Sequence, residues 1–174
     1  MLLERVEIVG FRCINRLSLQ LEQNNVLIGE NAWGKSSLLD ALTLLLSPED
    51  DLYHFVRDDF WFPPGDVTGR EKHLHIILTF RESEPGRHRV RRFRPLSPCW
   101  VPCDDGFHRI FYRREGEMAQ NEGVRTLRDF LDEKANPIPL DNIDDLARHL
   151  IRLTPVLRLR DARFMRRIRN GTVP

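Results

Sequence analysis

The stretch VLIGENAWGKSSLLDALTLLL, residues 26–46, constrains the fold more than any other part of the chain. Gly29 and Gly34 bracket four residues and are followed by Lys35 and Ser36, which is the phosphate-binding loop pattern. A chain of this length meets the pattern by accident about once in two hundred cases. The loop belongs between a strand and a helix. The apolar run at 26–28 predicts a strand buried on both faces, and leucines at helical spacing predict a helix over 36–46.

The residue types of this loop have mechanical reasons. Gly29 and Gly34 permit backbone conformations closed to other residues, so that successive N–H groups can turn inward around phosphate oxygens. Lys35 is expected to reach the β- and γ-phosphates as the catalytic cation, and Ser36 to ligate Mg²⁺. The positive end of the following helix points at the same anion. The predicted nucleotide-binding residues of the loop are Gly29, Glu30, Asn31, Ala32, Trp33, Gly34, Lys35, Ser36 and Ser37.

Two strands are predicted before the loop. Apolar and polar residues alternate over 3–21, with an interruption near 10–15, which indicates antiparallel strands joined by an irregular corner. In small-molecule kinases and GTPases the chain usually begins with the strand that carries the loop. The two strands predicted before the loop in this chain therefore disfavour these classes.

The remaining chain divides into three parts. Residues 47–71 are acidic and aromatic, and we interpret them as an insertion or lid. Residues 72–115 contain three alternating runs, HLHIILTF, HRVRRFR and FHRIFYRR, which predict an antiparallel β meander. Residues 124–169 form a helical and basic segment, with helices expected over 124–134 and 142–153 and a short strand at 156–159.

The order strand, Gly-Phe-Arg, strand, apolar strand, Gly-x-Asn-x-x-Gly-Lys-Ser and leucine-rich helix resembles the start of the ABC-type ATPase heads of RecF, of chromosome-maintenance (SMC) proteins and of the OLD family. OLD stands for overcoming lysogenisation defect. The segments DDFWFPPGD and HLHIILTF are most similar to OLD-family ATP-dependent endonucleases, which join such a head to a Toprim-type nuclease domain.

The resemblance implies an α/β (α+β) P-loop NTPase head, in which an antiparallel β-lobe packs against a mixed α/β lobe. It also implies ATP with Mg²⁺ and a homodimer of the full-length protein. Arg12 matches an early arginine that contacts the nucleotide or nearby DNA, and Asn31 matches the group's loop. The chain departs from many relatives at Ala32, where they have glycine, and at the bulky Trp33.

The parts needed for hydrolysis are not evident in these 174 residues. The family's Walker B acids follow a buried strand, but the pairs Asp58-Asp59, Asp104-Asp105 and Asp144-Asp145 follow no buried run. The signature segment and the Toprim acids are also missing. We therefore expect an incomplete head, the ATP-binding half of an ATP-dependent DNA endonuclease acting in repair, recombination or phage defence. The chain's end at 169–174 is interpreted as that of a piece of a longer protein.

A DNA-binding or scaffolding module that does not hydrolyse ATP is the alternative. On a strand, Arg87, Arg89 and Arg91 would project from one face about 7 Å apart, which suits the phosphates of double-stranded DNA. A solvated face balanced by acidic residues is the other interpretation of this run and is favoured slightly. The 27 basic and 26 acidic side chains nearly cancel, so the total charge favours no polyanion.

Metal binding outside the loop is disfavoured. Cys99, Cys103 and His108 lack a fourth zinc ligand, and His73 and His75 share a strand face without a carboxylate at suitable sequence spacing. The three cysteines form no disulfide framework, and the chain carries neither a signal peptide nor an apolar run long enough to span a membrane. A cytoplasmic location without membrane contact is therefore expected.

Overall fold

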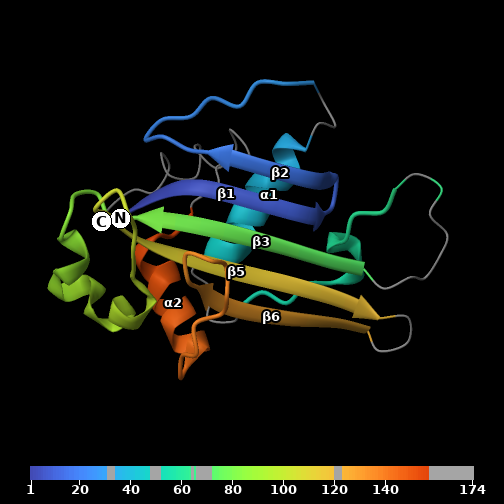
Figure 1. Ribbon diagram of the computed structural model, residues 1–174. Coiled ribbons are helices and arrows are strands. Elements are labelled where there is room, and N and C mark those ends of the chain that lie inside the picture. Colours follow the sequence, from blue (N-terminus) through green and yellow to red (C-terminus); the bar gives the residue numbers. More distant parts are fainter. Residues whose placement is uncertain (31–33, 48–51, 64, 66–71, 120–122, 157–174) are drawn as a thin grey trace, which may run out of the picture.

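The computed structural model describes residues 1–30, 34–47, 52–63, 65, 72–119 and 123–156. Over these residues the centre is an antiparallel sheet in which the strands follow the order β2-β1-β3-β5-β4, and β6 also pairs with β5 (Figure 1). The strands are β1 (Leu2–Phe11), β2 (Ile14–Gln20), β3 (Lys72–Arg81), β4 (Val101–Pro102), β5 (His108–Ala119) and β6 (Gly123–Leu131).

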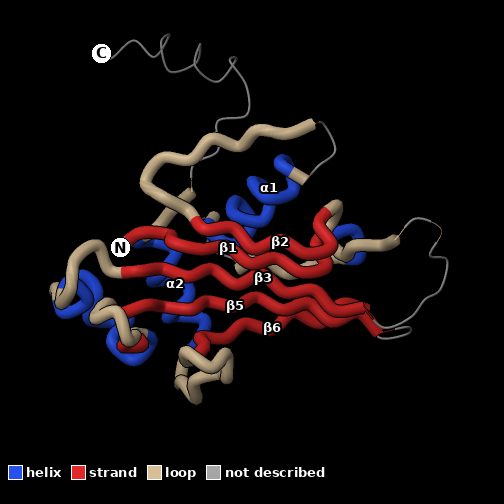
Figure 2. The backbone as a smooth tube through the Cα atoms, turned by 45° about the horizontal axis from the view of Figure 1, so that its top comes forward, coloured by secondary structure: helices blue, strands red, loops and turns tan. Residues whose placement is uncertain are grey.

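Helices cover one face of this sheet. Helix α1 (Lys35–Leu46) and helix α2 (Ile143–Leu153) lie on the same side of the strands in Figures 1 and 2. The strands alternate buried and accessible residues, as a sheet with one covered face requires. The buried set includes Val6, Ile8, Leu74, Ile76, Leu78, Ile110 and Tyr112 from the strands, Leu38, Ala41 and Leu45 from α1, and Ala147, Leu150 and Ile151 from α2.

The opposite face of the sheet is polar, and charged side chains on neighbouring strands pair across it. His75 stands opposite Glu115, and Arg113 stands opposite Asp129. The Arg113 guanidinium lies 2.8 Å from the Asp129 carboxylate. Opposite charges in register across neighbouring strands stabilise such a solvated face.

The described part of the predicted insertion is packed into the core. Leu52, Phe55 and Phe60 are buried, and Phe60 forms a β-bridge with Phe11 of β1. Gly116 of β5 makes room for these rings, because a Cβ there would lie 3.0 Å from Phe55 and 3.1 Å from Phe60. The short 3-10 helix η1 (Arg57–Asp59) lies between the two phenylalanines. Residues 48–51, 64 and 66–71 lie outside the described residues.

Several predicted elements are confirmed. The alternation over 3–21 is the β1–β2 pair, whose corner lies at 12–13, and the helix predicted over 36–46 is α1. The helix predicted over 142–153 is α2. The strand predicted at 156–159 lies outside the described residues except for Val156, whose N–H donates to the carbonyl of Leu46 at 3.3 Å.

The prediction of a buried strand at 26–28 is wrong for this chain. These residues form no strand, and Val26 and Ile28 are 85% and 91% exposed. A strand needs a hydrogen-bonded neighbour, and within the described residues β2 pairs only with β1, so the sheet ends there. The segment therefore runs as an extended loop above β2 (Figure 1).

The strand predicted for HRVRRFR is also wrong. This stretch forms two 3-10 helices, η2 (Arg87–Arg89) and η3 (Arg91–Cys99), so β3 pairs directly with β5. The buried residues Phe93, Leu96 and Cys99 recur at intervals of three, which is the period of a 3-10 helix. Pro95 and Pro98 lack the N–H groups that a strand ladder uses.

The helix predicted over 124–134 is a strand. Residues 123–131 form β6, which pairs with β5 from Gly123 opposite Ala119 to Leu131 opposite Phe111. The spacing of Leu127, Phe130 and Leu131 fits a helix, but the long accessible edge of β5 offers a complete ladder instead. Tertiary pairing overrides the local pattern here.

Candidate functional site

The glycine before helix α1 is required by both conformation and space. Gly34 has φ 84° and ψ 5°, in the left-handed region, and is the N-cap of α1. A Cβ at this position would lie 2.9 Å from Cγ1 of Ile14 on β2. The second glycine of the loop therefore lets the chain turn into the helix while Gly34 itself lies against Ile14 of β2.

The N-terminus of α1 suits an anion. No side chain caps it, and its first turn contains no acidic residue. The first hydrogen bond of the helix runs from the Leu38 N–H to the Gly34 carbonyl at 2.8 Å, so the N–H groups of residues 35–37 precede the helical ladder. Such donors, together with the positive end of the helix dipole, favour a phosphate.

Lys35 lies across the loop rather than away from it. Its Nζ donates to the carbonyl of Gly29 and, at 2.6 Å, to the carbonyl of Glu30. These bonds hold the lysine of the pattern against Gly29 and Glu30, where the loop begins. Ser36 is exposed, whereas Ser37 is buried in the core, so Ser36 is the hydroxyl available to a ligand.

The loop has a cavity on one side. A space of about 320 Å³ lies between β2, the extended segment 27–28 and the start of α1. Its walls include Ile14, Leu17, Ile28, Gly34 and Lys35. The predicted residues Asn31, Ala32 and Trp33 lie outside the described residues. The structure thus brings together Gly29, Glu30, Gly34, Lys35 and Ser36 of the predicted site.

Arg12 occupies the β1–β2 corner and is held by two carboxylates. Its Nε donates to Oδ1 of Asp59 at 3.0 Å, and its Nη1 donates to Oδ2 of Asp40 on α1 at 2.6 Å. Its backbone φ of 47° is also left-handed. Arg12 therefore ties the helix that follows the loop to the corner of the sheet, and 30% of its side chain is exposed.

Asp59 follows no buried run in the sequence, yet its side chain is buried and joins several hydrogen-bond partners. Besides Arg12, its Oδ2 accepts from the Tyr53 hydroxyl at 2.6 Å and from the Val56 N–H at 3.1 Å. Burial and this bond raise the pKa of Tyr53 to about 12. Its partners come from the β1–β2 corner and from the segment before η1, so no local sequence pattern identifies the hub.

Sequence reasoning also missed two histidine–carboxylate clusters that meet only in the fold. Glu117 stands opposite His73 and Glu115 opposite His75, so β5 supplies the carboxylates that the spacing along β3 did not show. His73, Glu115 and Glu117 could hold a metal ion, as could Glu82, His88 and His108.

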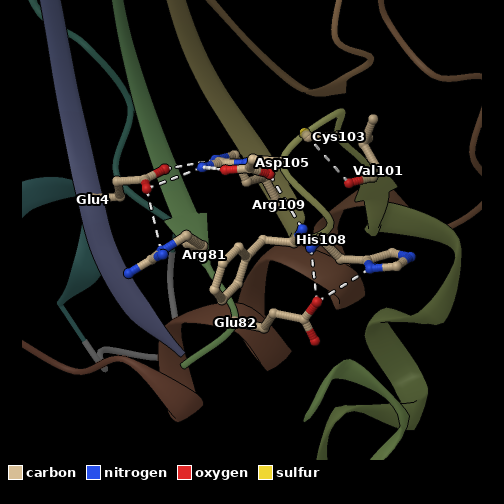
Figure 3. A network of polar contacts seen from close by, with 9 residues as sticks. Glu4, Arg81, Glu82, Val101, Cys103, Asp105, His108 and Arg109 are labelled. Atoms are coloured by element: carbon tan, nitrogen blue, oxygen red, sulfur yellow. Dashed lines mark hydrogen bonds and ion pairs between the residues drawn. The ribbon is translucent and has the colours of Figure 1, made fainter. Parts of the chain in front are cut away.

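The cysteines proposed with His108 take no part in these clusters. Cys99 is fully buried, and burial raises the pKa of its thiol to about 12, which opposes thiolate ligation. His108 instead contacts Glu82, with 3.1 Å between Nδ1 and Oε1 (Figure 3).

Comparisons with known proteins place the chain among relatives. A family model described as a protein of unknown function, DUF2813, matches residues 1–174. The chain is 80% identical over 174 residues to the uncharacterized protein YbjD of Escherichia coli (strain K12), covering 100% of this chain and 32% of that protein. It thus spans about a third of the length of that relative.

The fold is similar to that of a solved chain from work on ATP-driven dimerization and DNA stimulated activation of SMC ATPases. The TM-score is 0.54 at 12% identity, covering 99% of this chain and 92% of the other. This likeness confirms the expected mixed α/β fold of the SMC-head type. Among the described residues, no helix combines the length and the apolar character needed to cross a bilayer.

Proposed function

This chain belongs to the DUF2813 family of proteins of unknown function, and we propose that it forms the ATP-binding part of an SMC-like ATPase head. One observation carries the proposal: Gly34 turns the chain in a left-handed conformation into an uncapped helix, with Lys35 folded over the carbonyls of Gly29 and Glu30. A left-handed turn into an uncapped helix N-terminus with a lysine beside it supports polyphosphate binding.

The residues present fit Mg²⁺-ATP. Lys35 would hold the β- and γ-phosphates, the N–H groups of residues 35–37 would donate to phosphate oxygens, and Ser36 would ligate the metal. Bound Mg²⁺ would neutralise phosphate charge. The chain's own part is positioning and charge stabilisation, which supply most of the catalysis in phosphoryl transfer.

We further propose that the head is completed by other parts of a longer protein. The apolar residues 26–28 lie exposed directly before the loop, where a strand of a larger sheet would be buried. Two of the candidate acids are already paired: Asp59 with Arg12, and Asp144 with Arg128 at 2.6 Å. In this proposal, residues outside 1–174 activate the water, and the whole protein is an OLD-type ATP-dependent nuclease that acts as a homodimer.

Thermal unfolding of the purified protein with nucleotide tests the site. A ligand at a hundredfold excess over its dissociation constant stabilises the native state by about 2.7 kcal/mol. We expect millimolar ATP with Mg²⁺ to raise the midpoint, and EDTA to remove part of the rise. Ser36→Ala should lose the Mg²⁺-dependent part, whereas Ser97→Ala, an exposed serine on η3, should keep it. An unchanged midpoint in wild type, or full Mg²⁺ dependence in Ser36→Ala, contradicts the proposal.

A further inference from the structure

A cluster of arginines lies on the two 3-10 helices at one end of the sheet. Residues 87–94, here the arginine segment, contain five arginines in eight positions, and all five are exposed: Arg87, Arg89, Arg91, Arg92 and Arg94. Figure 1 shows η2 and η3 in green beyond the ends of the strands, beside the start of β1. Helix α1 and its N-terminus lie elsewhere, over the face of the sheet.

The arginines of the arginine segment differ from those of the sheet in their ion-pair partners. Arg81 and Arg109 both reach Glu4, at 3.2 and 2.6 Å, as Figure 3 shows. Arg113 and Arg128 are also paired with carboxylates. Within the part of the chain that the structure describes, none of the five guanidinium groups of the arginine segment forms an ion pair. Their charge is therefore available to an external anion.

The backbone of the arginine segment is fixed by hydrogen bonds to Glu82 and by side chains that pack into the core. The carboxylate of the buried Glu82 accepts hydrogen bonds from the backbone N–H of His88 at 2.9 Å and from that of His108 at 2.7 Å. The imidazole rings of the two histidines stack, with their centroids 3.7 Å apart. Phe93 and Leu96 insert into the core, and Phe93 packs edge-on against Trp100. A fixed backbone presents the arginines at a lower entropic cost than a flexible tail would.

The local field at this end of the sheet is positive. The pKa of the Met1 amino group is lowered by burial and then by Arg92 and Arg87, so these three cations share one region. The acids close by are Glu82, whose oxygens are taken by the two histidines, the exposed Glu84 in the preceding turn, and the exposed Asp141 and Asp145, which line a pocket with Pro95 and Pro98 of η3. Three exposed acids, of which Asp145 already pairs with Arg148, face five arginines, so an excess of positive charge remains.

The composition favours phosphodiester groups over a membrane or an acidic protein. The cations are all arginines, whose planar forks match phosphate oxygens in pairs. At about 2 Å per residue, Arg87 to Arg94 spans about 14 Å, or about four phosphates along one strand of a duplex. A membrane surface would also need exposed aromatic or apolar groups. Phe93 and Leu96 are buried, and Val90 at 37% is the exposed large apolar residue of the arginine segment.

We propose that the arginine segment binds the phosphate backbone of duplex nucleic acid, without reading its sequence. The site is separate from the nucleotide loop, so the proposal does not rest on the function proposed above. The charges of the arginine segment would neutralise phosphate groups and so anchor a duplex at the end of the sheet where β1 begins.

Fluorescence anisotropy with a labelled 30-base-pair DNA duplex, without nucleotide, tests this surface. Five contacts predict a slope of about −4.5 in a plot of log affinity against log salt. Arg89→Glu/Arg91→Glu should flatten the slope by about two and weaken binding by about tenfold or more at 0.1 M salt. The matched reversal Arg5→Glu/Arg125→Glu, at exposed arginines of the sheet, should retain more affinity, and Lys35→Ala should bind as wild type does.

Thermal unfolding midpoints establish that all variants are folded. Equal affinity of the two double variants overturns the proposal, as does the absence of DNA binding by folded wild type at 50 mM salt. Arginine-dependent binding to phosphatidylserine vesicles or to polyglutamate, with no binding to the duplex, overturns it in favour of a membrane or an acidic protein.

Discussion

Arg12 and Asp59 are joined through both backbone and side chain. The Arg12 N–H donates to the Asp59 carbonyl at 2.8 Å, and its Nε donates to the Asp59 carboxylate at 3.0 Å. Because Arg12 also contacts Asp40 of α1, this pair links the corner of the sheet to the helix that begins at the phosphate-binding pattern.

Asp59→Ala should lower the free energy of unfolding by about 3 kcal/mol, because it removes a buried carboxylate and leaves Arg12 and Tyr53 without their shared acceptor. Urea denaturation measures the change. Asp58→Ala, an exposed neighbour, should change stability by less than about 0.5 kcal/mol. Similar losses in the two variants would mean that the Asp59 hub does not hold the corner.

Gly34→Ala should destabilise the protein more than Gly86→Ala does. Both glycines have left-handed φ values, 84° and 85°, so each alanine costs about 1–2 kcal/mol in backbone strain. At Gly34 the new Cβ also meets Ile14, whereas at Gly86 nothing lies within 4 Å. Only Gly34→Ala should weaken nucleotide binding. Equal losses of stability, or unchanged ATP affinity in Gly34→Ala, would contradict this account of the turn.

Glu82 should contribute to acid unfolding. Although burial alone would raise its pKa, the backbone and ring N–H groups of His88 and His108 lower it from 4.5 to about 2. A carboxyl group with a depressed folded pKa stabilises the protein above its unfolded pKa, and this contribution is lost as the pH falls through the folded pKa. We expect about 3 kcal/mol to disappear between about pH 5 and pH 2.

Chemical denaturation of wild type and Glu82→Gln across that range measures the contribution. The variant should be less stable at pH 7, and the gap should narrow as wild-type Glu82 becomes protonated. A gap that stays constant from pH 7 to pH 2 would show that the charge on Glu82 does not stabilise the fold.

The cysteines should differ in reactivity. Cys13 is exposed at the β1–β2 corner, while Cys99 is buried and the pKa of its thiol is raised to about 12. A disulfide reagent at pH 8 should therefore modify Cys13 rapidly and reach Cys99 only on unfolding. Cys13→Ser should remove the fast phase. A fast phase that persists in Cys13→Ser/Cys103→Ser would require an accessible Cys99.

The sequence predicted those features that depend on short-range rules. The glycine–lysine pattern with its following helix, the first hairpin and α2 all follow from local periodicity and turn chemistry. The predictions for residues 26–28 and 124–134 are wrong because the structure of each segment depends on the edge of another strand. The former lacks such an edge within the described residues, and the latter finds one in β5.

The polar sites were harder to predict for the same reason. Glu82 and His108 are 26 residues apart, and Arg12 and Asp59 are 47 residues apart, so these partners meet only in the assembled fold. His88 follows Glu82 by six residues, but its contact with the carboxylate depends on the turn into η2. The arginine segment was visible as charge in the sequence. Its presentation on 3-10 helices follows from buried residues at intervals of three, a period that competed with the alternation of a strand.

Isothermal titration of Mg²⁺-ATP into wild type, Lys35→Ala and Lys134→Ala tests the central claim most directly. Lys134 is an exposed lysine in the turn after β6 and serves as the matched control. Loss of a charged hydrogen-bond donor to phosphate should weaken binding in Lys35→Ala by about ten- to a hundredfold, while Lys134→Ala binds as wild type does. Equal affinity of wild type and Lys35→Ala would contradict the assignment of this loop as a nucleotide site.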